Sequence, residues 1–600
     1  MKKNWVCLWV SLGLLAGAEG ACAQRPAAAP ATRYWVTLSD KKGVSFDPRR
    51  YFSPQAQARR QRQQLPAFEA SDLPVRPDYL AGITAVADTV TLVSRWFNAV
   101  ACRATPRQAA ALQHLPGVAS VVAWPQAAGA IAARQAGASL EGEPTTPLKP
   151  ISANDYLLAR RQTAHLDGPA LRAAGLEGHG VRIAVFDVGF RGLLAHPAFQ
   201  ELVKNKQIIA TRDFLRNRDD VYQSGSHGTE VMGCLAGRLP AAAGGAPGPA
   251  LGLAPAAGYL LARTEQLGRE RYAEEEAWLA AAEWADRLGA DIISSSLAYT
   301  EQRYFPEQMN GRRSLVSRAA NLAARKGMLV VSAAGNDGDN DWVRIGTPAD
   351  ADSVLAVGGL DPETGLHVDF SSYGPTADRR PKPNLAAFGI VLTTTPRGYE
   401  RLEGTSFSAP LLAGFAACLR QQNKEATAME LFRTLEKSGE LFPYFDYAHG
   451  YGRPRYQYTS SPGRPVTAAA PGPTFDFIAH DSLVAVVIRP EAALRPADLL
   501  PMLVEQSGIA VQVAFEGLAE SQIPARALPL PVGQPVPLPL PEPNYPPYLY
   551  WNLADRRGVL HRYETRAVTQ RLVVQVPRRL LQNGEVLKVH FKGYTGTYSE

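Results

Sequence analysis

The sequence predicts an α/β fold, in which a parallel sheet flanked by helices lies between a small N-terminal α+β unit and a C-terminal β-rich region. Two observations predict this arrangement. Between about Ile151 and Tyr458, short apolar segments alternate with amphipathic ones, a pattern typical of strand–helix units in a parallel sheet. Stretches rich in Ala, Gly and Pro precede and follow this region, and that composition is typical of linkers.

The chain has 600 residues, of which 46% are hydrophobic and 20% charged. That length exceeds what one compact core supports, and the composition is that of a globular protein. The patterns along the chain predict six parts: a signal peptide (1–23), a small α+β unit (24–125), a linker (126–150), the strand–helix domain (151–458), a second linker (459–473) and a β-rich accessory domain (474–600).

The N-terminus has the pattern of a secretory signal peptide. Lys2 and Lys3 precede the apolar run Trp5–Ala18, and the small residues Ala21 and Ala23 flank Cys22 before the expected mature start. This run is too short to anchor the chain across a membrane. We therefore expect a secreted or periplasmic protein with no transmembrane segment. A buried N-terminal helix and a lipoprotein acylated at Cys22 are the alternatives, and Glu19 argues against the second.

The net charge of +7 does not by itself indicate a nucleic-acid partner, because Lys and Arg are spread along the chain. The densest cluster, Arg59, Arg60 and Arg62, stands among glutamines and is interpreted as a solvated helical face. No recognition motif accompanies it, so we expect no nucleic-acid binding.

Three cysteines remain after the expected signal cleavage, namely Cys102, Cys234 and Cys418. Their odd number and wide spacing indicate neither a disulfide framework nor a zinc site. Buried free thiols are the preferred interpretation, and a Cys234–Cys418 bridge is left open.

Local patterns predict the main elements. In the N-terminal unit, Thr105 is a helix cap followed by Pro106 in the first turn. The predicted N-terminal elements are strands over Tyr34–Leu38, Val90–Cys102 and Val118–Trp124, a Gln/Arg-rich helix, and a helix over Thr105–Leu115. The predicted central elements are strands over Val181–Asp187, Asp291–Leu297 and Met328–Ala334, and helices over Tyr272–Leu288 and Arg313–Lys326. Runs at Leu483–Ile488 and Arg571–Val576 predict strands of the C-terminal domain.

Three polar side chains lie at positions typical of functional groups in parallel-sheet folds, at strand ends and in the segments that follow them. Asp187 ends an apolar strand, His227 opens an apolar helix, and Ser406 begins another within Gly-Thr-Ser-Phe-Ser-Ala-Pro. We expect Thr405 or Ser406 to cap that last helix and Pro410 to lie in its first turn. Each pattern alone also fits a structural role: an Asp at a strand end, a surface or capping His, and a helix-capping Ser.

Together, the three patterns resemble the subtilase family, the subtilisin-like serine proteases of peptidase family S8. The residues occur in the order Asp, His, Ser, 40 and 179 positions apart, which is the subtilisin order. Ser332–Asp337 resembles the oxyanion loop of that family, with Asn336 at the position of its amide. The resemblance implies a serine endopeptidase with Asp187, His227 and Ser406 as the catalytic triad.

The resemblance also implies a substrate site. Ser296, Leu297 and Ala298 correspond to the segment that pairs with the substrate backbone and forms one wall of the primary specificity pocket, and the other wall is formed by Ala333, Ala334 and Gly335. The small walls, with no facing carboxylate, favour an apolar or broad preference.

This sequence departs from the family pattern at two positions near the proposed triad. Val188 replaces a small hydroxyl residue, so one hydrogen bond to the catalytic Asp is expected to be missing, and Glu230 stands where many relatives carry a second His.

The resemblance implies partners as well as chemistry. We expect protein or peptide substrates, a propeptide that acts as an intramolecular inhibitor, a monomeric state and no required cofactor; structural calcium is left open because no ligand pattern matches. The competing hypothesis is a catalytically silent binding or adhesion protein that keeps the subtilase fold.

Overall fold

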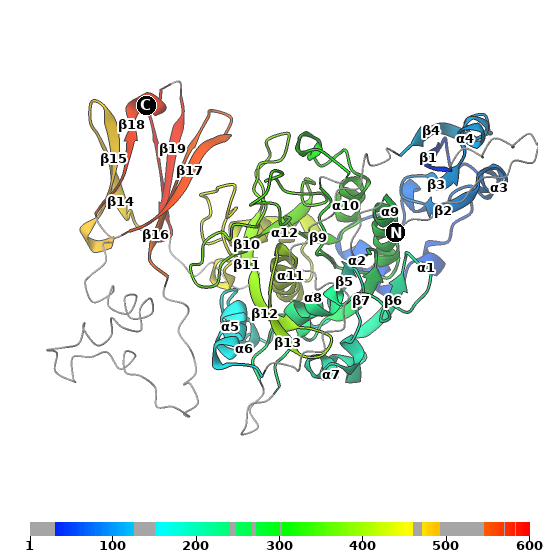
Figure 1. Cartoon of the computed structure of the whole chain (residues 1–600), viewed down its shortest axis with the longest axis horizontal. Coiled ribbons are helices and arrows are strands. Elements are labelled where there is room, and N and C mark those ends of the chain that lie inside the picture. Colours follow the sequence, from blue (N-terminus) through cyan, green and yellow to red (C-terminus); the bar gives the residue numbers. More distant parts are fainter. Residues whose placement is uncertain are drawn as a thin grey trace, which may run out of the picture.

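The structure, a computed structural model, describes residues 31–124, 150–240, 248–266, 272–300, 303–459, 471–492, 545–568, 571–582 and 584–600. The predicted signal peptide, nearly all of the first linker and most of the second linker lie outside the described residues. In Figure 1 the N-terminal domain and the C-terminal sheets lie at opposite ends of the central α/β domain.

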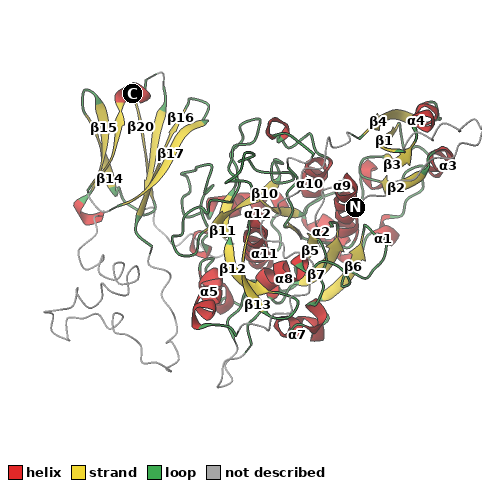
Figure 2. Ribbon diagram, in the orientation of Figure 1, coloured by secondary structure: helices red, strands yellow, loops and turns green. Residues whose placement is uncertain are grey.

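A seven-stranded sheet forms the centre of the molecule (Figure 2). Its order is β11-β10-β9-β8-β5-β7-β6, and all six strand pairs are parallel. The strands are β5 (Arg182–Asp187), β6 (Ile208–Asp213), β7 (Gly258–Arg263), β8 (Ile292–Ser295), β9 (Leu329–Ala333), β10 (Val354–Leu360) and β11 (Leu385–Phe388). The predicted parallel sheet is confirmed.

Helices cover both faces of this sheet, which is why its strands are apolar without alternation. On β5, Val185 packs into the core beneath one layer of helices and Phe186 into the core beneath the other. The first layer contains α8 (His227–Ala236), α11 (Thr405–Gln422) and α12 (Ala428–Lys437), and the second contains α9 (Tyr272–Arg287) and α10 (Leu315–Arg325). The remaining elements are α5 (Ala153–Ala164), α6 (Gly168–Ala173), α7 (Gln200–Lys204) and the hairpin β12 (Ile390–Thr394) and β13 (Tyr399–Glu403).

The N-terminal domain is a four-stranded antiparallel sheet with helices, as the α+β prediction requires. Thr105 forms the predicted cap, since its hydroxyl accepts from the Gln108 N–H. The prediction of one strand over Val90–Cys102 is wrong, because residues 95–98 form a turn that splits it into two paired strands. The elements are β1 (Thr32–Leu38), α1 (Pro48–Tyr51), α2 (Pro54–Arg62), α3 (Pro77–Val86), β2 (Thr89–Ser94), β3 (Ala99–Ala104), α4 (Pro106–Gln113) and β4 (Val118–Ala123).

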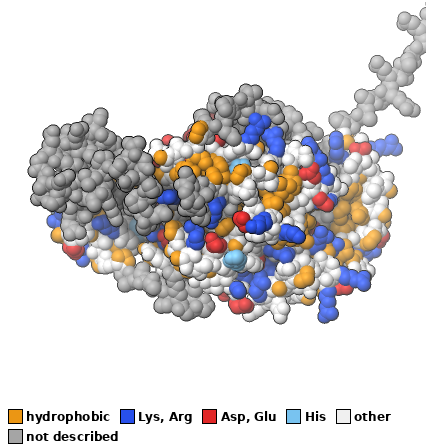
Figure 3. Space-filling model, turned by 90° about the horizontal axis from the view of Figure 1, so that it is seen from below, with side chains coloured by type: hydrophobic (Ala, Val, Ile, Leu, Met, Phe, Trp, Pro, Cys, Tyr) orange, Lys and Arg blue, Asp and Glu red, His pale blue; other side chains and the backbone are white. Residues whose placement is uncertain are grey.

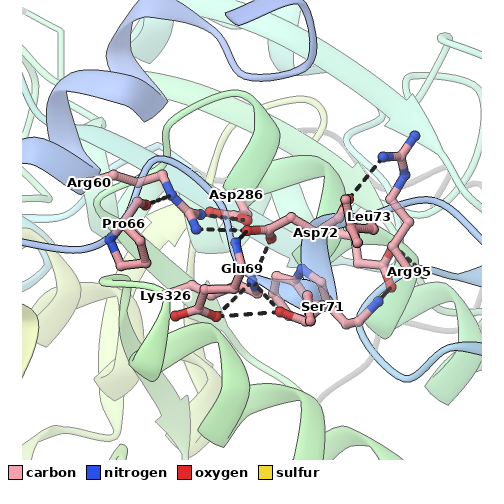
Figure 4. Close-up of polar contacts among 12 residues, drawn as sticks. Arg60, Pro66, Glu69, Ser71, Asp72, Leu73, Arg95, Asp286 and Lys326 are labelled. Atoms are coloured by element: carbon pink, nitrogen blue, oxygen red, sulfur yellow. Dashed lines mark hydrogen bonds and ion pairs between the residues drawn. The ribbon is translucent and has the colours of Figure 1, made fainter. Parts of the chain in front are cut away.

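The arginines of α2 contradict the prediction of a solvated face. The side chains of Arg59 and Arg60 are only 0% and 2% exposed, and they form ion pairs with Asp286 and Asp72. Figure 4 shows Arg60 beside these two carboxylates. The glutamines around these arginines suggested a solvent-exposed face. No local pattern in the sequence indicates the buried partner, because Asp286 belongs to the central domain and lies 227 positions from Arg59. On the face seen in Figure 3, other Lys and Arg side chains are interspersed with acidic and apolar ones.

The C-terminal region consists of two antiparallel sheets, which confirms the β-rich prediction. Residues of both sheets share one core, so they form a sandwich. The sandwich is joined to the central domain by a hydrogen bond from Asn552 to the Phe445 carbonyl (2.7 Å) and by a tilted ring contact between Tyr444 and Tyr550. The strands are β14 (Phe475–Ala479), β15 (Leu483–Ile488) and β18 (Leu572–Pro577) in one sheet, and β16 (Tyr548–Ala554), β17 (Leu560–Ala567), β19 (Val586–Phe591) and β20 (Tyr594–Ser599) in the other.

Cys102, Cys234 and Cys418 are buried free thiols, so the bridge left open by the sequence does not form. The Cys418 thiol lies 3.2 Å from each of the carbonyl oxygens of Leu176 and Leu253. Within the described part of the chain, no helix has the length and apolar character needed to cross a membrane.

Candidate active site

The predicted site residues gather at the carboxyl edge of the central sheet. Asp187 is the last residue of β5, Ser296 directly follows β8, and Asn336 lies three residues beyond β9. Parallel strands present their carboxyl ends at the same edge, so loops from distant parts of the sequence meet there.

Asp187 and His227 are in direct contact. The Asp187 carboxylate is fully buried, and its Oδ1 lies 2.8 Å from His227 Nδ1. The same oxygen accepts the backbone N–H of Val188 at 2.7 Å. This contact fixes the imidazole through Nδ1 and leaves Nε2 to face the opposite direction.

Two glycines bring the elements that carry this pair together. The Gly228 N–H donates to the Gly189 carbonyl at 2.9 Å. A Cβ on Gly228 would lie 2.5 Å from that carbonyl oxygen, and one on Gly189 would lie 1.7 Å from the Ser224 carbonyl oxygen. Side chains at either position would therefore push α8 away from the end of β5, and His227 away from Asp187.

The second oxygen of Asp187 shows the effect of the departure at Val188. Asp187 Oδ2 is buried and has no hydrogen-bond donor in the described part of the chain. Valine cannot supply one, as predicted from the sequence. At the other departure, Glu230 accepts a hydrogen bond from the Ser226 hydroxyl (3.0 Å), and burial raises the pKa of its carboxyl.

The electrostatics of the pair favour a charged imidazole. Burial alone disfavours the charged form of His227, but the adjacent Asp187 carboxylate outweighs burial and raises the pKa of His227 from 6.5 to about 9. Because only the neutral ring can accept a proton, the fraction able to act as a base grows as the pH rises towards 9.

Ser406 lies in the first turn of α11, but the predicted cap is wrong. The N-cap is Gly404, whose φ of 143° disfavours a side chain, and Thr405 is the first helical residue. Pro410 is the sixth residue of the helix, beyond the predicted first turn. The Thr405 hydroxyl is instead engaged by the loop after β9, which explains why it does not cap the helix.

Pro410 has a consequence for Ser406. Proline has no N–H, so the carbonyl four residues earlier, that of Ser406, loses its helical partner. The Ser296 hydroxyl donates to that carbonyl at 2.8 Å, and the Ser406 hydroxyl donates to the Ser296 carbonyl at 3.2 Å. The two serines thus hold the start of α11 against the end of β8.

This arrangement directs the Ser406 hydroxyl to Ser296 rather than to His227. The next residue, Phe407, packs beside the imidazole, with ring centroids 5.9 Å apart. A hydrogen bond from a catalytic serine to its histidine is often long or poorly aligned in the absence of substrate.

Asn336 is oriented by Thr405. The side-chain oxygen of Asn336 accepts from both the N–H and the hydroxyl of Thr405, each at 2.8 Å. Its amide nitrogen therefore points elsewhere. A Cβ built on Gly404 would lie 3.3 Å from that nitrogen and 3.7 Å from the backbone nitrogen of Ser406. Two N–H donors thus border one small space, which the missing side chain of Gly404 leaves free.

The predicted pocket walls are close together at their base. Tyr299 and Thr347 exchange backbone hydrogen bonds of 2.9 and 3.2 Å, and the Gly346 N–H donates to the Ala334 carbonyl at 3.0 Å. A Cβ added to Gly346 would lie 2.9 Å from the Thr300 Cγ2 and 3.1 Å from the Ala298 Cβ, so the space beside the Gly346 backbone is tight.

The remaining predicted pocket residues line the same region. Leu297 is 8% exposed and Ala298 partly exposed, whereas the opposite wall is buried at Ala333, Ala334 and Gly335. Among the described residues, no group of three or more His, Cys, Asp or Glu is arranged to hold a metal ion.

Sequence reasoning missed the roles of Thr405 and the Ser296 hydroxyl. The signal for Ser296 was available, because a proline four residues after Ser406 indicates a carbonyl in need of another donor. No sequence signal identified the contact from Thr405 to Asn336, which joins residues 69 positions apart.

Comparison with known proteins identifies two regions of similarity. Residues 178–452 match the subtilase family (peptidase S8), and residues 33–138 match the peptidase S8 propeptide domain of Bacteroidota. The first match contains all the candidate site residues, and the second contains the described N-terminal domain from Arg33 onward.

Individual relatives are similar over less than half of this chain. Serine protease AprX of Bacillus subtilis is 30% identical over 293 residues, which cover 44% of this chain and 62% of AprX. The major intracellular serine protease of the same organism is 30% identical over 275 residues, with coverage of 44% and 76%. Subtilisin BL of Lederbergia lenta is 28% identical over 277 residues, with coverage of 46% and 89%. The chain thus spans less than two thirds of AprX but most of the other two.

The coupling of His227 to Asp187 can be tested by NMR titration. We expect the imidazole of His227 to titrate near pH 9. In Asp187→Asn the attraction is lost while burial remains, so its pKa should fall below 6.5. Asp219→Asn, which changes an 82% exposed carboxylate, should leave the titration unchanged. A pKa of 6.5 or lower for His227 in the unsubstituted chain would contradict the electrostatic account.

Proposed function

The chain belongs to the subtilase family of serine endopeptidases, and we propose that it cleaves peptide bonds with Asp187, His227 and Ser406 as its catalytic triad. The observation that supports this most is the Asp187–His227 contact of 2.8 Å beside the first turn of the helix that carries Ser406. A serine hydroxyl is a weak nucleophile and needs such a base.

In the proposed reaction, His227 Nε2 takes the proton of the Ser406 hydroxyl as its oxygen attacks the scissile carbonyl carbon. The same nitrogen then delivers that proton to the leaving amine, and a water molecule later hydrolyses the acyl-enzyme by the same route. Asp187 holds the imidazole through Nδ1 and stabilises the imidazolium formed in between.

The carbonyl oxygen becomes negatively charged in the tetrahedral intermediate. We assign its binding to the side-chain amide of Asn336 and the backbone N–H of Ser406, the two donors beside Gly404. In the first turn of a helix, a backbone N–H has no acceptor within the helix and lies at the positive end of the helix dipole. Donors fixed before the reaction stabilise the developing charge without reorganisation.

We also propose that the protein is exported and that the N-terminal domain is a propeptide that inhibits the enzyme within its own chain. The signal-like residues 1–23 support export, and the propeptide match over residues 33–138 supports the second role. The substrates are then proteins or peptides outside the cytoplasm.

The role of Ser406 is tested with a fluorophosphonate probe and a peptide library. We expect the probe to label the processed protein, and Ser406→Ala to abolish labelling and to lower kcat roughly a millionfold. Ser294→Ala is a matched control, because the buried Ser294 hydroxyl has no hydrogen-bond partner in the described chain. If the folded, processed protein stays unlabelled, or if Ser406→Ala cleaves as well as the parent, the catalytically silent alternative is favoured.

The sequence predicts that the primary specificity pocket accepts apolar or varied substrate side chains. From the residues at the base of this pocket, we propose that it accepts only small ones. We expect Gly, Ala or Ser on the amino side of the cleaved bond, because a Cβ added to Gly346 would lie only 3.1 Å from the Ala298 Cβ. Ala298→Gly should raise kcat/KM for Leu or Phe at that position by at least about tenfold. Ala210→Gly, on the edge strand β6, controls for general loosening. A parent enzyme that already prefers Leu or Phe would refute this narrow pocket while leaving the proposed triad intact.

A further inference from the structure

A cavity of about 910 Å³ lies between the central domain and the C-terminal sandwich. In Figure 1 the sandwich lies beside the end of the central sheet that β10 and β11 form. His165 lines the cavity from the central domain, and its ring lies against Phe388, the last residue of β11. Of the described residues that line the cavity, none belongs to the proposed triad. Its volume is within the range of small-molecule sites, which occur preferentially at domain interfaces.

Contacts within the lining join the two walls of the cavity. The Tyr545 hydroxyl donates to the Pro362 carbonyl at 2.9 Å, and a Cβ added to Gly365 would lie 2.7 Å from the Tyr545 ring. Tyr550 packs against Tyr444, with ring centroids 5.9 Å apart. In each contact the lining tyrosine belongs to the C-terminal region and its partner to the central domain. The cavity is therefore enclosed within a packed interface.

Partly exposed tyrosines form much of the lining. Tyr458 comes from the central domain, and Tyr545, Tyr548 and Tyr594 come from the C-terminal region. A tyrosine offers a flat apolar face together with a hydroxyl that both donates and accepts hydrogen bonds. Such side chains suit a ligand that has C–H bonds on one face and hydroxyls around its edge, as a pyranose ring does.

The lining also carries more positive than negative charge. Its cationic side chains outnumber its carboxylates by four to one: Lys437, Arg453, Arg455 and Lys592 against Glu440. Both arginines have acidic partners, since Arg453 Nε donates to Glu440 at 2.7 Å and Arg455 Nε donates to Asp167 at 3.1 Å. The two lysines account for the remaining charge.

Lys437 and Lys592 face the cavity from opposite walls. Lys437 is the last residue of α12 in the central domain, and Lys592 lies in the turn between β19 and β20 of the sandwich. Both are exposed, and neither forms an ion pair within the described part of the chain. The Lys592 amine donates to the Ala492 carbonyl at 3.1 Å. The cavity thus has ammonium groups without carboxylate partners on both of its walls.

The backbone of Lys592 is unusual for a lysine. Its φ is 46°, in the left-handed region that favours glycine and asparagine. Residues in this region are enriched at ligand-binding sites, where a side chain is needed in spite of the strain. A lysine in this turn therefore indicates a use for its charge.

We propose that this cavity binds an acidic oligosaccharide, with tyrosine rings against its pyranose faces and the ammonium groups of Lys437 and Lys592 at its carboxylates. Hydrogen bonds between an ammonium and a carboxylate are among the stronger polar contacts in proteins. A neutral sugar would leave the lysines without a partner, whereas a small inorganic anion would leave the tyrosine faces bare. A uronic acid matches both kinds of side chain. The proposal does not rest on the proposed peptidase activity, because the triad lies outside the cavity.

Calorimetric titration with tetragalacturonic acid tests the proposal. The full chain carries Ser406→Ala so that self-cleavage does not interfere. We expect a dissociation constant below about 1 mM that rises with salt, and binding of the neutral maltotetraose that is at least about tenfold weaker. A dissociation constant above about 1 mM for tetragalacturonic acid would overturn the proposal. Equal or tighter binding of a tetraglutamate peptide or a thymidine tetranucleotide would overturn the assignment to a sugar.

Lysine variants locate the ligand. The double variant Lys437→Gln/Lys592→Asn should weaken binding of tetragalacturonic acid at least about tenfold, and asparagine preserves the turn because it tolerates positive φ. Lys206→Asn is the matched control, since Lys206 is also exposed, has a φ of 54° and lies between α7 and β6, the opposite edge strand of the central sheet. It should bind like the parent. If the double variant binds as tightly as this control, the ligand does not occupy the cavity.

Tyr548→Leu tests the aromatic part of the site separately. Its side chain is only partly buried, so circular dichroism should show an unchanged fold. We expect it to weaken the binding of tetragalacturonic acid at least about threefold at any salt concentration, because the lost ring contact is not screened by ions. Unchanged affinity would mean that the rings do not contact the sugar.

Discussion

The contact between the Asp187 carboxylate and the His227 imidazole is the interaction on which the candidate site depends. It requires a buried carboxylate at the end of β5, and it fixes the imidazole ring at the start of α8. The two elements must lie close enough at one edge of the sheet for Asp187 Oδ1 to come within 2.8 Å of His227 Nδ1. The glycines at 189 and 228 permit that approach. Without a buried carboxylate, burial alone would keep the imidazole neutral but would leave its orientation undetermined.

The start of α11 is held by a different device. A helix that contains Pro410 leaves the Ser406 carbonyl without its usual donor, and Ser296 supplies one from the neighbouring strand end. The carbonyl oxygen that lacks a helical donor thus forms a hydrogen bond between α11 and the residue that follows β8. Gly404 adds the space in which Asn336 and the first turn of the helix present their donors together. The proposed nucleophile, base and anion-binding donors therefore depend on backbone geometry as much as on side-chain identity.

Patterns within short segments predicted much of this architecture. The apolar run ending at Asp187 and the helix opening at His227 were readable because a strand end and a helix start are local features. The Asp, His, Ser order then indicated that they meet. Contacts between distant segments were not readable. Arg59 lies among glutamines in the sequence, and nothing near it indicates that it forms a buried ion pair with Asp286. The cap of α11 was mispredicted for the same reason, since the Thr405 hydroxyl is taken by Asn336 from a loop 69 positions away.

The central claim is that Asp187, His227, Ser406 and the side-chain amide of Asn336 act together on the carbonyl group of one peptide bond. A crystal structure of the chain with a phosphonate bound to Ser406 tests this claim most directly. The account predicts His227 Nε2 within hydrogen-bond distance of the adduct and the Asn336 amide nitrogen about 3 Å from its phosphonyl oxygen. An adduct whose phosphonyl oxygen points away from Asn336, with His227 Nε2 bound to another group, would contradict the account.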